Sequence, residues 1–279
     1  MARIVTALTT LWVLFSRDLP AQSDVPRVFW GAVAPVTRWR YLIFPGHLTL
    51  ERIVGAVAVA ALIGVLLGIR PRPCAFVASL ALYHLAPMEA IIWTNSPYIR
   101  GLDTPVIALA ALSISPCGDA LSLLRPAIPS DRHPSEYAWP VRLIQLQIVC
   151  IYFFSGYSKI MDVGWYWASA ENMRAWMLAF NQRAEAMPFR SPGLWLAAHP
   201  ALCRSMGLGT LAFELTFPVV LFIRRARIVY VPAALLFHAG IFLMMNIAVL
   251  YEPFFIVFFD WFPSRVPIPE KSVPVECAA

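Results

Sequence analysis

The sequence predicts an all-α integral membrane protein, a bundle of about six transmembrane helices with short interfacial or re-entrant helices between them. Three observations predict this fold class. The chain is 59% apolar and 14% charged, whereas soluble domains average about 45–50% apolar and about 25% charged residues. Its mean hydropathy is +0.67. The apolar residues also form long runs, separated by short segments that are rich in arginine or proline.

Residues 1–47 are predicted to form an N-terminal interfacial segment. Its start, "MARIVTALTTLWVLFSRD", has a basic residue followed by a short apolar run. A signal peptide begins in this way, but no convincing small-x-small cleavage site follows. We therefore expect a short interfacial helix or a first membrane helix. Residues 16–47 mix prolines, aromatics and arginines, which is typical of a segment lying along lipid headgroups.

The predicted membrane spans follow the apolar runs, and proline, glycine and charged residues mark their ends. The first clear run is close to the minimum of about 17 residues that a helix needs to cross a bilayer. The predicted spans are residues 48–70, 74–94, 104–115, 141–161, 205–223 and 228–262, the last broken at Glu252–Pro253 into a full span and a short one.

The segments between the spans are of two kinds. Residues 125–140 are expected to form a polar, proline-rich loop, and the amphipathic residues 163–204 short helices on or partly in the membrane. The chain is thus divided into the interfacial segment 1–47, a transmembrane domain over residues 48–262 and a polar tail over residues 263–279.

The net charge of +6 comes almost entirely from arginine. Nucleic acid is not the expected partner, because the arginines lie at the ends of apolar runs rather than in a basic polar segment with interleaved aromatics. By the positive-inside rule, the connections near 70–72, 125–142 and 224–227 are predicted to be cytoplasmic. We expect a multi-pass protein of a bacterial inner or plasma membrane, with the lipid bilayer as its partner.

Several kinds of site find no support in the sequence. The five cysteines are scattered, so neither a disulfide framework nor a zinc spacing is indicated. The chain has no HExxH, GxSxG, GxGxxG or phosphate-loop motif and no DDxxD-like carboxylate pair. The histidines His47, His84 and His238 are far apart in sequence. No metal site is inferred.

Polar residues within the apolar runs are the candidates for function, because a charged side chain at bilayer depth costs about 2.5–3.5 kcal/mol and normally faces the protein interior. These residues are His84, Glu89, Lys159, Asp162, Glu214, His238, Asn246, Glu252 and Asp260. Glu214 and His238 lie near the middle of their spans, where they either pair with each other or with Lys159, or line a cavity. Asp260 is expected as an interfacial anchor and Glu252 at the surface.

Lys159 allows two interpretations. A lysine near the end of a helix can extend its ammonium to the headgroups. Alternatively, the amine is partly desolvated and serves as a base, since a neutral amine accepts protons. The small residues Ser155, Gly156 and Ser158 before it favour the second interpretation, because they let a neighbouring helix or a flat ligand approach the backbone.

The stretch "LQIVCIYFFSGYSKIMDVGWYW" resembles the signature segment of the HTTM superfamily, the membrane domain of vitamin K-dependent γ-carboxylase-like proteins. The matching residues are Tyr152, Phe153, Ser155, Gly156, Lys159 and Trp165. Three further segments agree in order: "LTLERIVGAVAVAALIGVLLG", the Asn-to-Ser segment that begins at Asn95 and includes Asp103, and the closing spans around His238. The resemblance covers most of residues 48–262.

The resemblance implies a helical bundle that binds a lipid-soluble small molecule, with a quinol such as vitamin K hydroquinone or menaquinol as cofactor. It implies that Lys159 is the base that deprotonates the quinol. From their positions within the apolar runs, we expect His238 and Glu214 as its catalytic partners. A protein or peptide is a further implied partner. The residues assigned to substrate binding are Tyr152, Ser155, Gly156, Trp165, His84, Glu89, Asn95, Asp103 and Asn246.

Two departures from the carboxylase pattern change the expected reaction. The carboxylase has adjacent lysines, and Ser158 replaces the first of them here. It also has a large C-terminal domain that grips its protein substrate, where this sequence has the tail 263–279. We therefore expect a smaller lipid-phase reaction rather than protein γ-carboxylation.

Three other functions remain open. One is a protonation-initiated cyclisation of an isoprenoid, with Glu89, Glu214 or Asp260 as the acid and aromatic faces to stabilise a carbocation. Another is a non-enzymatic accessory in the maturation, immunity or export of a small peptide or lipid, in which buried polar groups pair and leave no sizeable cavity. A transporter is disfavoured, since no inverted repeat is visible. Convergence of Lys159, His238 and Glu214 on one apolar cavity would favour an enzyme.

Overall fold

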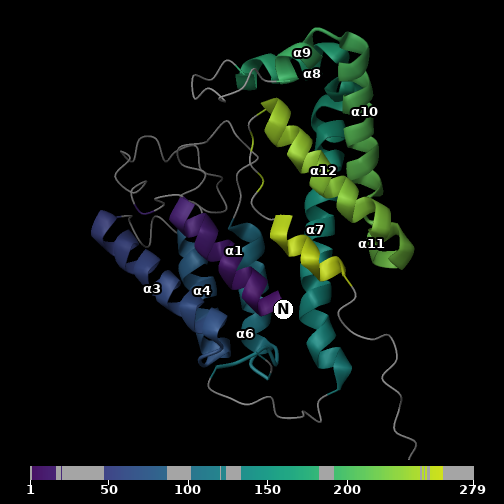
Figure 1. Cartoon of the computed structure of the whole chain (residues 1–279). Coiled ribbons are helices and arrows are strands. Elements are labelled where there is room, and N and C mark those ends of the chain that lie inside the picture. The colour runs from purple at the N-terminus through teal and green to yellow at the C-terminus, as the bar shows by residue number, and fades with distance from the viewer. Residues whose placement is uncertain are drawn as a thin grey trace, which may run out of the picture.

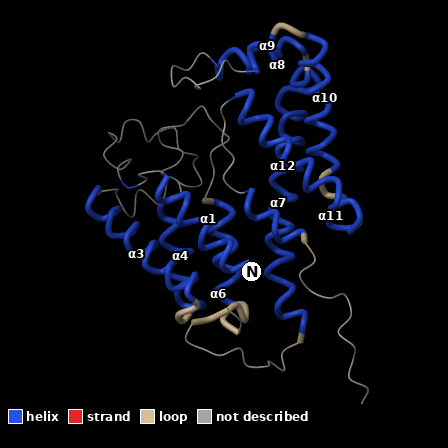
Figure 2. Tube along the Cα trace, in the orientation of Figure 1, coloured by secondary structure: helices blue, strands red, loops and turns tan. Residues whose placement is uncertain are grey.

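The computed structural model describes residues 2–16, 20, 47–86, 102–119, 121–123, 133–181, 192–245, 247, 249 and 252–259. Every regular element in these ranges is helical and none is a strand (Figure 2), which confirms the predicted all-α class. The elements are α1 (Ala2–Ser16), α3 (Leu48–Leu67), α4 (Pro71–Leu85), α6 (Asp103–Ile114), α7 (Pro134–Val163), η3 (Gly164–Ala168), α8 (Ala170–Asn181), α9 (Pro192–Ala197), α10 (Pro200–Thr216), α11 (Val219–Phe222), η4 (Arg224–Ala226), α12 (Arg227–Met245) and η5 (Glu252–Phe258) (Figure 1).

Four stretches of the described chain are long and apolar enough to cross a membrane, so the chain is an integral membrane protein. They are Leu48–Leu67, Ser135–Ala168, Pro200–Phe222 and Arg224–Met245. The helices α1 and α6 are apolar but shorter. The predicted second span, 74–94, is represented by α4, and its remainder lies outside the described residues. The total of six spans stays a prediction.

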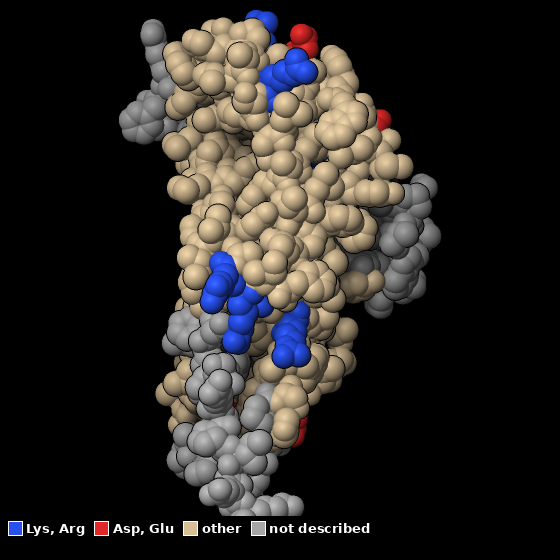
Figure 3. Space-filling model, turned by 90° about the vertical axis from the view of Figure 1, so that its right-hand side faces the viewer, with Lys and Arg blue, Asp and Glu red and all other residues tan. Residues whose placement is uncertain are grey.

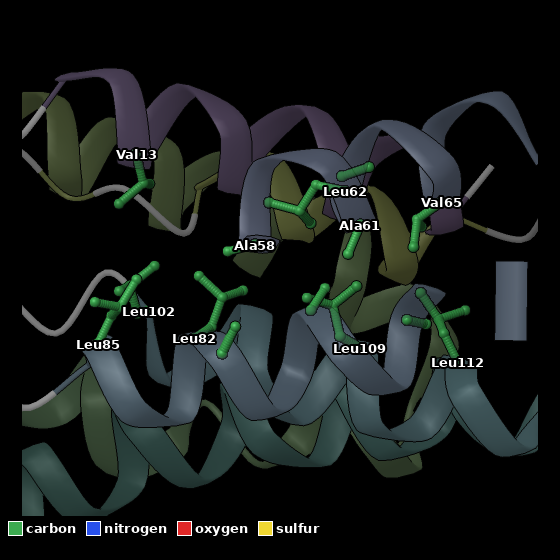
Figure 4. Close-up of a cluster of buried hydrophobic side chains, with 14 residues drawn as sticks. Val13, Ala58, Ala61, Leu62, Val65, Leu82, Leu85, Leu102, Leu109 and Leu112 are labelled. Atoms are coloured by element: carbon green, nitrogen blue, oxygen red, sulfur yellow. The ribbon is translucent and has the colours of Figure 1, made fainter. Parts of the chain in front are cut away.

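The helices α1, α3, α4 and α6 pack around one apolar cluster. Figure 4 shows Leu62 and Val65 of α3 pointing toward Leu82 of α4 and toward Leu109 and Leu112 of α6. These leucines and valines are at most 4% exposed. Burying such a side chain contributes about 1.5–3 kcal/mol, so the cluster holds these helices together.

Helix α7 is longer than the sequence predicted. It starts at Pro134 and runs for 30 residues, about 45 Å at 1.5 Å per residue. The expectation that 125–140 is a loop is therefore wrong for residues 134–140. The ring of His133 accepts a hydrogen bond from the Ser135 amide and caps the helix, and a proline in the first turn lacks only an amide hydrogen that would have no helical partner.

The remaining helices form the other part of the bundle. Helices α10, α11 and α12 pack with α7 and η5 around a second apolar cluster that includes Tyr152, Phe217 and Phe255. The short helices α8 and α9 lie across the end where α7 and α12 finish (Figure 1). The prediction of short helices in 163–204 is confirmed for η3, α8 and α9, and their place on or partly in the membrane stays a prediction.

Charged side chains are absent from most of one face of the bundle. On the face shown in Figure 3, lysines and arginines gather in a few places and wide areas between them carry no charge. Along α10 and α11, Glu214 is the only charged residue between Arg204 and Arg224, and it is 4% exposed. Such a surface suits lipid tails, which cannot solvate charge.

Arg3 connects α1 to the segment that follows α6. It is 4% exposed, and its guanidinium donates to the carbonyl of Cys117 at 3.1 Å and to that of Leu121. Ser122 beside them donates to the carbonyl of Gly68 at 2.7 Å. The left-handed backbone of Gly68, with φ of 75°, closes the turn between α3 and α4.

Replacement of Arg3 by methionine is expected to destabilise the detergent-solubilised protein by about 1–3 kcal/mol, because two partly buried carbonyls lose their donor. The measurement is thermal unfolding followed by tryptophan fluorescence. Arg204→Met is the matched control, since Arg204 is exposed on α10. Equal unfolding midpoints for the two variants would contradict the role assigned to Arg3.

Candidate functional site

A cavity of about 1210 Å³ lies between α7, α8, α10 and α12, with residues of α4 and α6 at its edge. It is partly open, and its wall is mostly apolar. Ligand pockets usually measure about 300–1,000 Å³, so this cavity is large enough for a sizeable lipid-soluble molecule. Lys159, Glu214 and His238, the three residues predicted to be catalytic, all line it.

Lys159 and Glu214 form an ion pair in the cavity wall. The Lys159 ammonium donates to Oε1 of Glu214, to Oε2 at 2.6 Å and to Oγ of Ser155 at 2.9 Å. Ser155 in turn donates to Oε1 at 3.2 Å. The two charged side chains are 11% and 5% exposed. The lysine is therefore enclosed by protein partners rather than extended toward the headgroups.

A close approach of α7 and α10 makes this pairing geometry available. A Cβ atom added to Gly156 would lie 3.0 Å from Cβ of Glu214 and 3.2 Å from Cγ of Leu215. Glycine thus lets the two backbones come near enough for the Lys159 ammonium to contact both carboxylate oxygens of Glu214. This is the function that small residues commonly have between membrane helices.

Trp167, rather than the predicted Trp165, lies beside Lys159. The Lys159 ammonium lies 4.7 Å from the ring centroid of Trp167, within cation–π range. Trp165 is 70% exposed and does not line the cavity. Helix α7 ends at Val163, its cap residue Gly164 has a φ of 68°, and the 3₁₀ turn η3 that starts there brings the later tryptophan to the wall. The proximity of Trp167 to Lys159 in sequence was the available signal.

Tyr152 and His238 form a second polar group in the same wall. The hydroxyl of Tyr152 and Nε2 of His238 are 2.9 Å apart, and both residues are almost fully buried. On the other side of the ring, Nδ1 lies 3.6 Å from Oε1 of Glu252. Glu214 and His238 therefore have separate partners. The Glu252 side chain is 38% exposed, which is compatible with the surface position predicted for it.

The other predicted binding residues lie in different places. Asp103 lines the cavity at the start of α6. His84 does not line it, and its Nε2 lies 2.9 Å from Oε1 of Glu51, which is completely buried between α3 and α4. This partner was missed because it is 33 residues away in sequence. Glu89, Asn95, Asn246 and Asp260 are outside the described residues.

The wall also contains Asp162, Ser158 and Gln147. Within the part of the chain that the structure describes, no group of three or more His, Cys, Asp and Glu side chains could hold a metal ion. The chemistry offered by the described wall includes an amine, an imidazole, and carboxyl, hydroxyl and phenol groups. These groups exchange protons, and each can hydrogen-bond to a polar atom of an otherwise apolar ligand.

The fold and the cavity define an integral membrane protein with an intramembrane, mostly apolar site that contains a buried ion pair. Comparison with protein families gives the same class a name. The family model of the HTTM domain matches residues 34–261, and the chain belongs to the HTTM domain family, which is associated with vitamin K-dependent carboxylase-like membrane proteins. Neither the curated proteins nor the solved structures compared with the chain give a match.

Two glycine-to-alanine variants test the close approach of α7 and α10. A methyl group in a helix usually stabilises by about 1 kcal/mol relative to glycine. At Gly240 an added Cβ meets nothing within 4 Å, so Gly240→Ala is expected to keep or raise the unfolding midpoint. At Gly156 the crowding is expected to reverse the sign and cost about 1–3 kcal/mol. The thermal midpoints in detergent give the comparison, and a stabilised Gly156→Ala variant would contradict it.

Proposed function

We propose that this HTTM protein is a carboxylase-like enzyme of a bacterial inner or plasma membrane that acts on a lipid-soluble quinol or isoprenoid in the cavity. The observation that supports this function best is the Lys159–Glu214 ion pair in an apolar wall. Ionisable groups at membrane depth are costly and usually serve a function. Here the pair faces a space large enough for a substrate.

The pair can change from a charged to a neutral form by an internal proton transfer, without a change in net charge. Transfer of one proton from Nζ of Lys159 to Glu214 leaves a neutral amine beside a neutral carboxylic acid. Low polarity around the pair penalises separated charges and makes this neutral form accessible. A neutral amine that faces the cavity is a usable base.

The wall fits a quinol, which when bound would supply an acidic hydroxyl group and reducing electrons. Lys159 would accept the hydroxyl proton, and Ser155, already within hydrogen-bond distance of the amine, would orient it. Trp167 lies against the ammonium and would keep water away from it. The apolar residues of the wall would hold the ring system and an isoprenoid tail.

A non-enzymatic accessory role is less well supported. That role predicts that buried polar groups pair with each other, as Lys159 does with Glu214 and Tyr152 with His238. It also predicts that no sizeable cavity remains. A cavity of about 1210 Å³ between the two pairs favours an enzyme.

Purified protein in detergent provides the main test, with a 1,4-naphthoquinone that carries a short isoprenoid tail as the probe. The probe is expected to quench tryptophan fluorescence on binding, and Trp167→Phe is expected to reduce the quenching. Trp195→Phe is the matched control, because Trp195 is 61% exposed on α9. With the reduced probe, wild type is expected to shift the absorbance toward the deprotonated quinol.

Single replacement of either charged residue would leave a buried charge unpaired, at a cost of about 3–5 kcal/mol. The informative variant is therefore the double replacement Lys159→Met with Glu214→Gln, which removes both charges. It is expected to fold and to bind the probe, but not to deprotonate it. Equal deprotonation by the double variant would exclude Lys159 as the base, and absence of probe binding to wild type would exclude this ligand class.

Isoprenoid cyclisation is a second candidate, supported by the carboxyl groups and aromatic rings that line the same cavity. Asp103 and Asp162 supply the carboxyls, and Trp167, Trp176 and Tyr83 supply rings. Such rings stabilise cations, and a carboxylic acid could start the reaction by protonating a double bond. Asp103 and Asp162 are the candidate acids because both line the cavity.

The cyclase function predicts that incubation with a linear polyprene gives cyclic hydrocarbon products, detected by gas chromatography with mass spectrometry. Asp103→Asn or Asp162→Asn is expected to abolish them. Glu171→Gln, an exposed change on α8, is the control. If wild type returns the polyprene unchanged, cyclisation is excluded for that substrate.

A further inference from the structure

We infer that Tyr152, His238 and Glu252 form a second proton path of the cavity, separate from the Lys159–Glu214 pair. Three elements supply one residue each: α7, and the consecutive elements α12 and η5. Tyr152 and His238 line the cavity, whereas Glu252 does not. The inference rests on the proposed function in one respect only, namely the reaction in the cavity that uses the proton.

The geometry orders the three groups from the interior outward. Tyr152 is 2% exposed, His238 is 3% exposed and the Glu252 side chain is 38% exposed. The phenol and Nε2 are 2.9 Å apart. Nδ1 and the Glu252 carboxylate are 3.6 Å apart, beyond a hydrogen bond, so a small rotation of the carboxylate is needed before a proton passes.

The surrounding residues hold these groups in place. The Tyr152 ring stacks on Phe217, with centroids 4.1 Å apart and an interplanar angle of 19°. The ring of Phe255 lies beside both the tyrosine and the histidine rings, with 6.2 Å between ring centroids in each case. Gln145 of α7 donates a buried hydrogen bond to the carbonyl of Val257 and fixes η5 against α7. The carboxylate of Glu252 is therefore positioned by the same short helix that packs on Tyr152.

The transfer balances in protons and involves no oxidation or reduction. Tyr152 passes its hydroxyl proton to Nε2 of His238, and the ring passes the Nδ1 proton to Glu252. The tyrosinate then takes a proton from a group in the cavity, and the net result is one proton moved from the cavity to Glu252. In reverse, the same steps return a proton to the cavity and restore the first tautomer of the ring.

In this path Tyr152 is the catalytic group that faces the ligand, and Glu252 is a positioning residue that acts through His238. A purely structural Tyr152–His238 hydrogen bond would also stabilise the bundle. It would not, however, make proton exchange at the imidazole depend on the carboxylate of Glu252. Exchange at the ring nitrogen therefore separates the two explanations.

The experiment uses the full chain without ligand, labelled with ¹⁵N-histidine in detergent micelles. The His238 signals are assigned by their loss in His238→Gln, since the chain has five histidines. Ring ¹⁵N shifts report the tautomer, which is expected to be Nδ1–H with Nε2 accepting from Tyr152. Exchange of this hydrogen with water is expected to slow by about a hundredfold in Glu252→Gln, the lower end of what a positioned acid–base group contributes.

The matched variants decide the result. Glu252→Asp keeps a carboxylate and is expected to restore most of the exchange rate, whereas Glu171→Gln is expected to change nothing. Tyr152→Phe is expected to alter the tautomer ratio of His238 and to leave the effect of Glu252 intact. An Nε2–H tautomer in wild type, or unchanged exchange in Glu252→Gln, would overturn the inference. Because no ligand is present, failure of the quinone probe to bind has no bearing on this outcome.

Discussion

The ion pair between Lys159 and Glu214 is the constraint on which the rest of the site depends. Two opposite charges in an apolar environment must remain in contact, because separating them there is far more costly than in water. Contact in turn requires that α7 and α10 approach closely, and Gly156 permits this approach. Ser155 supplies a further hydrogen bond and Trp167 an aromatic face. Gly156, Ser155 and Trp167 therefore all help to keep the two charges in contact.

The cavity lies between two contacts that α7 makes with its neighbours. Helices α7 and α10 are in contact at Gly156, and α12 approaches α7 through Tyr152 and His238 instead. Mostly apolar side chains line the space between these two contacts, and residues of α8 form part of its wall. Two polar groups thus face one apolar volume from different places on its wall, an arrangement suited to a ligand with few polar atoms.

Local chemistry made part of this arrangement predictable. The small residues before Lys159 indicated a close neighbour, and the sparse charge within apolar runs indicated which residues face inward. Contacts between distant segments were not predictable from a single sequence, which is why the partner of His84, Glu51, was missed. Backbone geometry was the other source of error. The turn at Gly164 places Trp167 rather than Trp165 beside Lys159. His133 caps α7 at a proline that was interpreted as part of a loop.

The contact between Arg3 and the carbonyls of Cys117 and Leu121 has a consequence for the order in which the bundle assembles. These residues are separated by 114 and 118 positions in the chain. During synthesis the first helix therefore emerges long before its acceptors exist. Its guanidinium must stay in water or among headgroups until α3, α4 and α6 have been made, since an unpaired arginine is costly within the bilayer. Helix α1 thus reaches its final place only after residue 121, well beyond its own end, has been made.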